Sequence, residues 1–324
     1  MEKTLHPNLS APSSPAAPSA ATQSGEGAQG GPKTKGAKDV LERFMHLLFL
    51  LCGIVAVAFV LCISVYLIIS GLPAIQEIGL GKFLLGQTWA PTAADPSYSI
   101  LPFLLTSVYG TAGAIVVGVP IGLMTAVFLA KVAPPKLAAV IRTAVQLLAG
   151  IPSVVYGLVG MIVLVPAIRR AFGLGSGACL LAAILVLTVM VLPSIINVAE
   201  TALQAVPREY EEASLALGAT ETETYFRVSL PAARSGVAAA VVLGVGRAIG
   251  EAMAIIMVAG NVANMPGLFT SVRFLTTGII SGMSDAAVGS LYQQALFSIG
   301  LVLFLFIMLI NVLLNVCIKR RKED

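Results

Sequence analysis

An arginine and a glutamate lie in the middle of a long apolar segment. Arg247 and Glu251 are four residues apart in the stretch GVGRAIGEAMA, a spacing that predicts one shared helix face. Each charge costs roughly 2.5–3.5 kcal/mol at the centre of a membrane-spanning helix, so such residues usually face a cavity or a partner and mark a pathway. A guanidinium can meet the oxygens of a compact anion with paired hydrogen bonds. Arg247 is therefore the candidate anion contact.

Two interpretations of Glu251 remain open. A bare carboxylate would repel an anion, so we expect Glu251 to pair with Arg247 and to release it in one conformation. On this interpretation, Arg247 and Glu251 together line the substrate path. The alternative is a permanent buried salt bridge that joins helices and serves packing alone.

A second chemically distinctive stretch, PREYEEASLALGATETETYFRVSLP, runs from Pro207 to Pro231 between two apolar segments. We name it the 207–231 hairpin. Pro207 suits the first turn of a helix, and three glutamates after it favour the positive end of that helix. Gly218 then supplies a stop. These residues predict a short helix that ends in a glycine turn.

The second half of the 207–231 hairpin predicts another short helix. Thr220, with Glu223 three residues later, matches a capping box. The run that follows places Phe226, Ser229 and Leu230 on one face. We expect Pro231 to break this helix.

The same residues carry a spaced pattern. Glu212-Ala213-Ser214, three residues, Gly218, nine residues and Val228-Ser229-Leu230-Pro231 resemble the EAA loop of ATP-binding-cassette (ABC) importer permeases. Ser214 and Val228 depart from the usual alanine and isoleucine. The resemblance implies a cytoplasmic coupling helix seated in a groove of an ATPase subunit, with small residues that permit close packing. The alternative is that the 207–231 hairpin is an ordinary amphipathic loop helix without a coupling role. The residues that the resemblance assigns to ATPase coupling are Glu212, Ala213, Gly218, Leu230 and Pro231.

The elements around these residues are long and apolar. The chain has 324 residues, of which 57% are hydrophobic and only 11% charged, more apolar surface than a soluble fold of this length could bury. A bilayer core of about 30 Å needs roughly 20 helical residues, and alternating strand patterns are absent. We therefore predict an all-α membrane protein with six spans. They run approximately over Met45–Ser70, Leu101–Ala130, Gln146–Ile168, Gly177–Val198, Ser235–Gly260 and Ala295–Ile318.

Basic residues flank these spans unequally. On one side lie Lys33, Lys35, Lys38, Arg43, Lys131, Lys136, Arg142, Arg208, Arg227, Arg234, Lys319, Arg320, Arg321 and Lys322. On the other side lie only Lys82, Arg169, Arg170 and Arg273. The positive-inside rule then predicts that both termini and the 207–231 hairpin are cytoplasmic. The last basic cluster is expected to be an ordinary anchor at the lipid headgroups.

The chain ends and outer loops complete the expected organisation. Residues 1–40 are rich in Pro, Ala, Ser and Gly and predict a disordered cytoplasmic tail without a signal-peptide pattern, followed by a permease domain over 41–324. Trp89, in the first outer segment, is expected to anchor at the membrane interface rather than to form a partner-docking surface. The outer loop Asn261–Gln294 predicts a short re-entrant or interfacial helix.

Several function classes are excluded by residue types. Four cysteines lie in apolar runs without metal spacing, and the only histidines are His6 and His46, so we expect no metal site and no catalytic triad. No phosphate-binding loop of the form G-x-x-x-x-G-K-[ST] occurs, so this chain is not expected to hydrolyse ATP itself. We expect no cofactor, no catalytic residue and no nucleic-acid partner.

A more specific resemblance rests on four strings. Gly150 to Gly157 (GIPSVVYG), Gly246 to Ala254 (GRAIGEAMA), Trp89-Ala90-Pro91 and Ile100 to Phe103 resemble phosphate-specific ABC importer permeases of the PstC type. The resemblance begins near Phe83 and extends to the C-terminus. It implies the type I, MetI-like permease fold in the cell inner membrane and phosphate as the solute.

The PstC-type resemblance also implies partners. These are two copies of a separate ATPase, a second permease of the PstA type and an extracytoplasmic phosphate-binding protein. Two alternatives stay open: a permease for molybdate, tungstate or sulfate, and a membrane protein that acts in assembly and not in transport. The assembly alternative predicts no stable complex with an ATPase.

Overall fold

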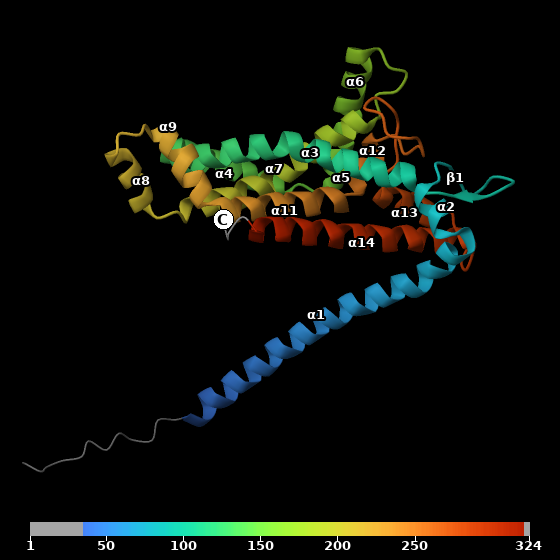
Figure 1. Ribbon diagram of the computed structural model, residues 1–324, viewed down its shortest axis with the longest axis horizontal. Helices are drawn as coiled ribbons and strands as arrows, with labels where there is room; N and C mark the ends of the chain where they lie inside the picture. Colours follow the sequence, from blue (N-terminus) through green and yellow to red (C-terminus); the bar gives the residue numbers. More distant parts are fainter. Residues whose placement is uncertain (1–34, 321–324) are drawn as a thin grey trace, which may run out of the picture. The chain divides into compact units, whose positions relative to one another are not determined.

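The computed structural model describes residues 35–320, and its elements are almost all helices (Figure 1). Residues 1–34 of the expected tail lie outside the described residues. Helix α1 begins at Lys35, before the expected domain boundary at residue 41. The chain divides into two compact units, Met1–Ala58 and Phe59–Asp324, and the second unit holds every site discussed below.

The elements follow one another along the chain as a series of long helices, short helices and three π-helical segments (η). The first half contains α1 (Lys35–Ile78), α2 (Leu80–Leu85), β1 (Trp89–Ala90), β2 (Ser97–Tyr98), α3 (Leu101–Val127), η1 (Phe128–Val132), α4 (Pro135–Gly150), α5 (Ser153–Val159), η2 (Gly160–Leu164) and α6 (Val165–Phe172). The second half contains α7 (Leu180–Gln204), α8 (Arg208–Ala216), α9 (Glu221–Thr224), η3 (Tyr225–Ser229), α10 (Leu230–Ala232), α11 (Arg234–Gly250), α12 (Met253–Val258), α13 (Leu275–Met283) and α14 (Leu291–Arg320).

Five of the described helices are long and apolar enough to span a membrane. They are Leu41–Ile78, Leu101–Val132, Ser153–Phe172, Leu180–Gln204 and Leu291–Leu314. A sixth span is available if Glu221–Ala232 and Arg234–Gly250, which meet at a bend of 73°, are taken together. The all-α membrane fold is thus confirmed, with five to six candidate spans.

Two of the expected span boundaries are wrong. The third span begins at Ser153 and not at Gln146, because the backbone is extended at Ile151 and Pro152 and separates α4 from α5. The fifth span does not continue to Gly260, because α11 ends at Gly250 and a separate short helix, α12, follows. Proline accounts for the first break, since it cannot donate a backbone hydrogen bond.

Helix α7 is the centre of the second unit and packs along α3 and α11 (Figure 1). Glycines on α3 allow a close approach of this helix to α7. A Cβ atom at Gly113 would lie 2.7 Å from Ile184, and one at Gly122 would lie 2.7 Å from Ile195. Because these positions carry no side chain, the two backbones come together as in other small-residue helix contacts.

A second core cluster lies at the end of this unit that is opposite α8 and α9 (Figure 1). Strands β1 and β2 form an antiparallel hairpin in which Trp89 pairs with Tyr98. Trp89 is only 9% exposed, and its ring contacts those of Tyr98, Phe103 and Tyr292. The expectation of an interfacial anchor is therefore wrong for Trp89, which is a core residue. The short helix expected in the Asn261–Gln294 loop is present as α13.

Candidate transport path and coupling hairpin

The 207–231 hairpin folds into the expected pair of short helices, α8 and α9, at one end of the unit (Figure 1). Gly218 forms the turn between them with φ +90°, a backbone conformation that favours glycine. The capping box is confirmed: Thr220 Oγ1 accepts a hydrogen bond of 3.3 Å from the Glu223 amide, and Glu223 Oε2 accepts one of 3.1 Å from the Thr220 amide. Local sequence signals therefore define this turn.

Pro231 does not break the second helix, contrary to the sequence expectation. The π-helical segment η3 precedes it, and Pro231 lies in the first turn of α10, where a missing amide hydrogen is tolerated. The helical path ends only at Ala233, where the chain bends by 73° into α11. The hairpin is thus joined directly to α11.

One carboxylate ties the hairpin to a membrane-spanning helix. Glu211 Oε1 lies 2.5 Å from Lys131 Nζ in η1, at the end of α3, and accepts a 2.7 Å hydrogen bond from Ser229 Oγ in η3. Burial raises the pKa of Glu211, but the hydrogen bonds from Lys131 and Ser229 outweigh it and hold that pKa below its ordinary value. Three segments that are distant in sequence therefore meet at Glu211.

A second ion pair stabilises the same end of the unit. Arg142 Nε on α4 lies 2.6 Å from Glu200 Oε1 in the last turns of α7, and Gln204 Nε2 donates to the same oxygen at 3.0 Å. Glu200 is buried, and Arg142 also donates to the backbone oxygen of Leu129. This network holds α4, η1 and α7 together.

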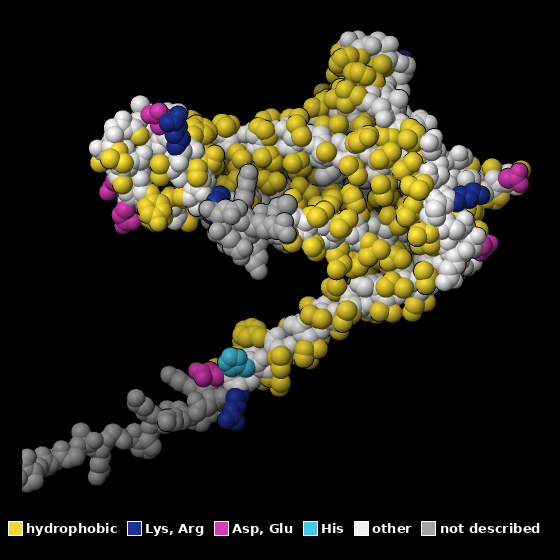
Figure 2. Space-filling view, viewed as in Figure 1, with side chains coloured by type: hydrophobic (Ala, Val, Ile, Leu, Met, Phe, Trp, Pro, Cys, Tyr) yellow, Lys and Arg dark blue, Asp and Glu magenta, His cyan; other side chains and the backbone are white. Residues whose placement is uncertain are grey.

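Most of the residues assigned to ATPase coupling are on the surface. Glu212, Ala213, Gly218 and Pro231 are exposed, and Leu230 is half-buried. Apolar side chains of the 207–231 hairpin are also exposed: Leu217 is 90% exposed and Tyr210 is 56% exposed. Hydrophobic atoms are visible among charged ones on this end of the molecule (Figure 2). Leu217 and Tyr210 thus leave apolar area exposed on a mostly polar projection.

Arg247 and Glu251 do not form the expected ion pair. They do not share a continuous helix, because α11 ends at Gly250 and the backbone is extended at Glu251. Glu251 Oε1 instead accepts a 3.0 Å hydrogen bond from the Ala254 amide and so caps α12, while its backbone oxygen accepts a 2.9 Å bond from Thr276 Oγ1. The one-face placement is therefore wrong, and the pair is not formed in this conformation.

Arg247 is exposed on the surface of the described chain. It makes one long side-chain hydrogen bond, of 3.5 Å, from Nη1 to Ser194 Oγ on α7. Among the described side chains no carboxylate forms a salt bridge with it. A guanidinium in this position is available to an anion or to a partner subunit.

This fold and the surface hairpin define a class of protein: the membrane permease of an ABC importer. The chain belongs to the family of binding-protein-dependent transport system inner membrane components, whose family model matches residues 118–323.

Several curated relatives cover most of the chain. It is 39% identical to the probable ABC transporter permease protein YqgH of Bacillus subtilis, over 81% of this chain and 87% of that protein. It is 33% identical to the phosphate transport system permease protein PstC of Haemophilus influenzae, over 81% of this chain and 88% of that protein. It is also 33% identical to PstC of Xylella fastidiosa strain Temecula1, over 90% of this chain and 96% of that protein. The resemblance to PstC-type permeases is thus confirmed.

Solved structures support the fold. An inward-facing MetNI methionine ABC transporter chain matches with a TM-score of 0.55 and 23% identity, over 68% of this chain and 95% of that one. A second match is a chain of a bacterial alginate ABC transporter, solved in complex with an alginate pentasaccharide-bound periplasmic protein. Its TM-score is 0.60 and its identity 16%, over 88% of this chain and 98% of that one. At these identities the likeness concerns the fold alone, and it confirms the expected MetI-like architecture.

Proposed function

We propose that this chain is the inner-membrane permease subunit of an ATP-driven phosphate importer. It forms part of the translocation path and couples that path to a separate ATPase, present in two copies. Its other proposed partners are a second permease of the PstA type and an extracytoplasmic phosphate-binding protein. Both termini and the 207–231 hairpin are cytoplasmic in this proposal.

The observation that carries the coupling role is the exposed apolar surface of the 207–231 hairpin. Leu217 and Tyr210 leave apolar area in contact with water, which a partner surface would remove favourably. The hairpin is also continuous with α11 and is tied to α3 through the Lys131–Glu211 ion pair. A displacement of the hairpin by an ATPase would therefore be passed to two spans.

The path in this proposal runs past Arg247 and Glu251. Arg247 is exposed on the described chain, which favours a path at the interface with the second permease, where the guanidinium would meet the anion. Glu251 closes α11 and opens α12, so its carboxylate marks the break in this segment. Irregular backbone at membrane depth is tolerated where it lies in protein or lines a wet cavity, which supports a role for the break in the path.

Phosphate is supported by the PstC relatives and by the availability of Arg247. Transport of the anion is tested with the complete complex in vesicles, measuring uptake of radioactive phosphate that depends on the binding protein and ATP. Unlabelled phosphate should compete, whereas molybdate, tungstate and sulfate should not at the same concentration. Absence of radioactive phosphate uptake, together with uptake of labelled molybdate, tungstate or sulfate by the same complex, would assign the other substrate.

The coupling role has its own test, with two matched surface variants. Leu217→Glu puts a charge on the 207–231 hairpin, and Val288→Glu puts one on the equally exposed loop between α13 and α14, where the side chain is 93% exposed. We expect only Leu217→Glu to lose co-purification of the ATPase. Equal ATPase recovery with both variants would contradict the proposed docking surface.

A further inference from the structure

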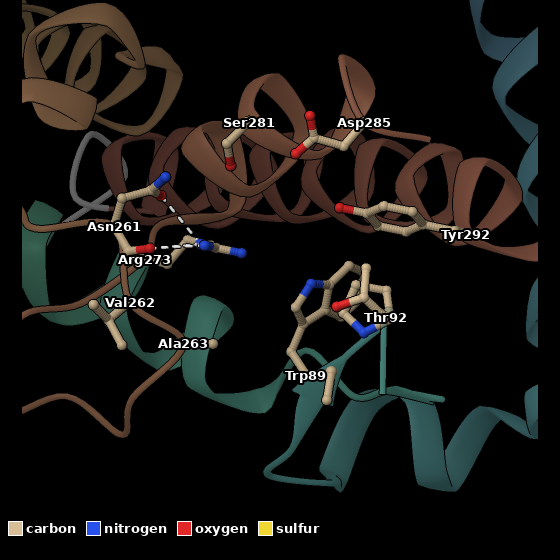
Figure 3. Close-up of a pocket in the computed structure, with 11 residues that line it drawn as sticks. Trp89, Thr92, Asn261, Val262, Ala263, Arg273, Ser281, Asp285 and Tyr292 are labelled. Atoms are coloured by element: carbon tan, nitrogen blue, oxygen red, sulfur yellow. Dashed lines mark hydrogen bonds between the residues drawn. The ribbon is translucent and has the colours of Figure 1, made fainter. Parts of the chain in front are cut away.

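A cavity of about 740 Å³ lies at the end of the second unit that is opposite α8 and α9 (Figure 3). Its walls come from four places: the start of the β1–β2 hairpin, the segment after α12, both ends of α13 and the first turn of α14. The lining residues used below are Asn261, Arg273, Ser281, Asp285 and Tyr292. We name it the Arg273 cavity.

One edge of the Arg273 guanidinium is fixed. Nε donates to the backbone oxygen of Asn261 at 3.0 Å and to its Oδ1 at 3.1 Å, and Nη2 donates to the same backbone oxygen at 2.7 Å. Asn261 adopts a left-handed backbone conformation, φ +53°, which asparagine tolerates better than most residues. The guanidinium carbon lies 5.7 Å from the centre of the Phe103 ring. These contacts hold the group in a single orientation.

The charge of Arg273 has no matching carboxylate. Within the described part of the chain no acidic side chain forms a salt bridge with it, and Nη1 has no hydrogen-bond partner. Burial lowers the pKa of Arg273 from its ordinary value, yet an arginine remains charged at neutral pH. A half-buried cation that forms no salt bridge and donates hydrogen bonds only to neutral oxygen atoms attracts an anion into the open side of its site.

The other polar groups of the cavity define which anion fits. Ser281 Oγ donates its hydrogen to the backbone oxygen of Thr277 at 2.7 Å, so toward the cavity it can only accept. Asp285 offers a carboxylate, and in Figure 3 its side chain and the hydroxyl of Tyr292 extend toward the space beside Arg273. The site therefore offers strong donors together with acceptors. It suits an anion that both accepts and donates hydrogen bonds.

Hydrogen phosphate has this character, because it carries acceptor oxygens and one or two hydroxyl groups at neutral pH. Sulfate has only acceptor oxygens, and Asp285 and Ser281 would be left facing it without a donor. We propose that the Arg273 cavity is a second binding site for a protonated oxyanion of the phosphate class. Arg273 supplies the charge and Asp285 accepts the hydrogen of the anion.

This proposal rests on the proposed function for the identity of the solute, and it adds a point of selection before Arg247. The cavity lies on the side that basic-residue counts predict to be extracytoplasmic. Its volume leaves room for the anion and several waters. Retained hydration would keep the site weak, which a conducting path requires, since each solute must also leave.

The test measures equilibrium binding of radioactive inorganic phosphate to the purified complex in detergent, without binding protein or nucleotide. An Arg247→Gln background removes the other candidate anion contact. In that background Arg273→Gln should weaken phosphate binding by about 10- to 100-fold. Arg170→Gln, which removes an exposed arginine on α6 that does not line the cavity, should leave binding unchanged.

A second variant tests selection. Asp285→Asn should reduce the ratio of phosphate affinity to sulfate affinity by at least about fivefold and leave the thermal unfolding midpoint unchanged. If Arg273 had a structural role alone, Arg273→Gln would lower the unfolding midpoint and Asp285→Asn would leave the preference for phosphate unaltered. This pair of results would overturn the proposal.

Two further outcomes would also overturn it. In the first, Arg273→Gln binds phosphate as tightly as its background does. In the second, the wild-type complex binds no phosphate while Arg273→Gln abolishes stimulation of the ATPase by the binding protein, which would make the cavity a receptor for a protein side chain. Failure of the proposed function would appear separately, as absence of phosphate uptake by the complete wild-type system.

Discussion

The two ends of the second unit use their charges differently. At the 207–231 hairpin end, Lys131 pairs with Glu211, and Arg142 pairs with Glu200. At the cavity end, Arg273 is held by neutral oxygen atoms of Asn261 without a carboxylate. Arg247, within the apolar part of α11, likewise has no acidic partner among the described side chains.

This contrast separates positioning from binding. A lysine or arginine that is already paired with a carboxylate fixes the geometry of the segments it joins, and because its charge is neutralised it attracts a mobile anion only weakly. An arginine stabilised only by dipoles keeps its net charge, so that a solute can complete the site. Substitutions at the two kinds of arginine should therefore produce different defects.

The largest effect is expected for Arg247→Gln. Loss of the guanidinium in the span should reduce phosphate uptake by the complex by about 100-fold, because an ionic hydrogen-bond partner of the anion is removed. ATPase co-purification and thermal stability should stay near wild type, since this side chain makes only one long contact. Wild-type uptake would remove Arg247 from the path.

Arg142→Gln should produce the opposite pattern. It leaves Glu200 buried without its cation, and because the Arg142 side chain is 40% exposed we expect a loss of about 1–3 kcal/mol in the free energy of unfolding. Phosphate binding by the remaining folded complex should be unchanged. Adding Glu200→Gln should recover part of the stability, as measured by thermal unfolding. An additive loss in the double variant would show that the pair is not coupled.

Glu211→Gln should weaken the link between the 207–231 hairpin and α3. The glutamine keeps a hydrogen-bond acceptor for Ser229 but loses the ion pair with Lys131. We expect phosphate imported per ATP hydrolysed to fall by about 3- to 10-fold, with ATPase binding retained. Lys131→Met should have the same effect, and the double variant should be no worse than either single one.

Gly218→Ala introduces a Cβ at a backbone conformation with φ +90°. No atom crowds this position, so the expected cost is conformational strain alone, about 1 kcal/mol. Uptake should fall by about twofold, and proteolysis of the hairpin should accelerate. Gly175→Ala, another uncrowded loop glycine without a positive φ, is the matched control.

The smallest effect is a pH dependence that appears only in acid. The folded pKa of Glu211 lies below its unfolded value of about 4.3, so its contribution to stability is complete above that value. It is lost as the pH falls through the lower folded pKa. The protection factors of the α8 amides, which correct for the intrinsic pH dependence of exchange, should therefore be unchanged between pH 7 and 5 and should fall below about pH 4 in wild type, whereas Glu211→Gln should lack this component.

Features encoded over a few residues could be predicted from the sequence. Gly218 and the Thr220–Glu223 capping box each act within four positions, and the structure has both. The apolar runs likewise predicted the helical membrane fold. The predicted span boundaries are wrong near Pro152 and Glu251, because the packing of the surrounding helices decides how far a broken helical segment continues.

Contacts across the fold could not be predicted in this way. Five complete helical elements, α4, α5, η2, α6 and α7, separate Lys131 from Glu211 in the sequence, and no periodicity links the two residues. Trp89 was assigned to the interface from its type and location, but Phe103 and Tyr292 enclose it from other elements. The expected Arg247–Glu251 pair is not formed in this conformation, because the helix breaks between the two residues and the Glu251 carboxylate accepts a hydrogen bond from the Ala254 amide.

The 73° bend at Ala233 gives the protein the geometry of a crank. The arm of the crank is the short helical path that ends in α10, and its shaft is α11. A force that a partner applies to the arm would therefore rotate α11 about its own axis. The Lys131–Glu211 pair fastens the same arm to the end of α3, and the shaft carries Arg247 on its own surface. Turning α11 by a fraction of a helical turn would therefore move Arg247, the proposed anion contact, across the proposed path without any change in its chemistry.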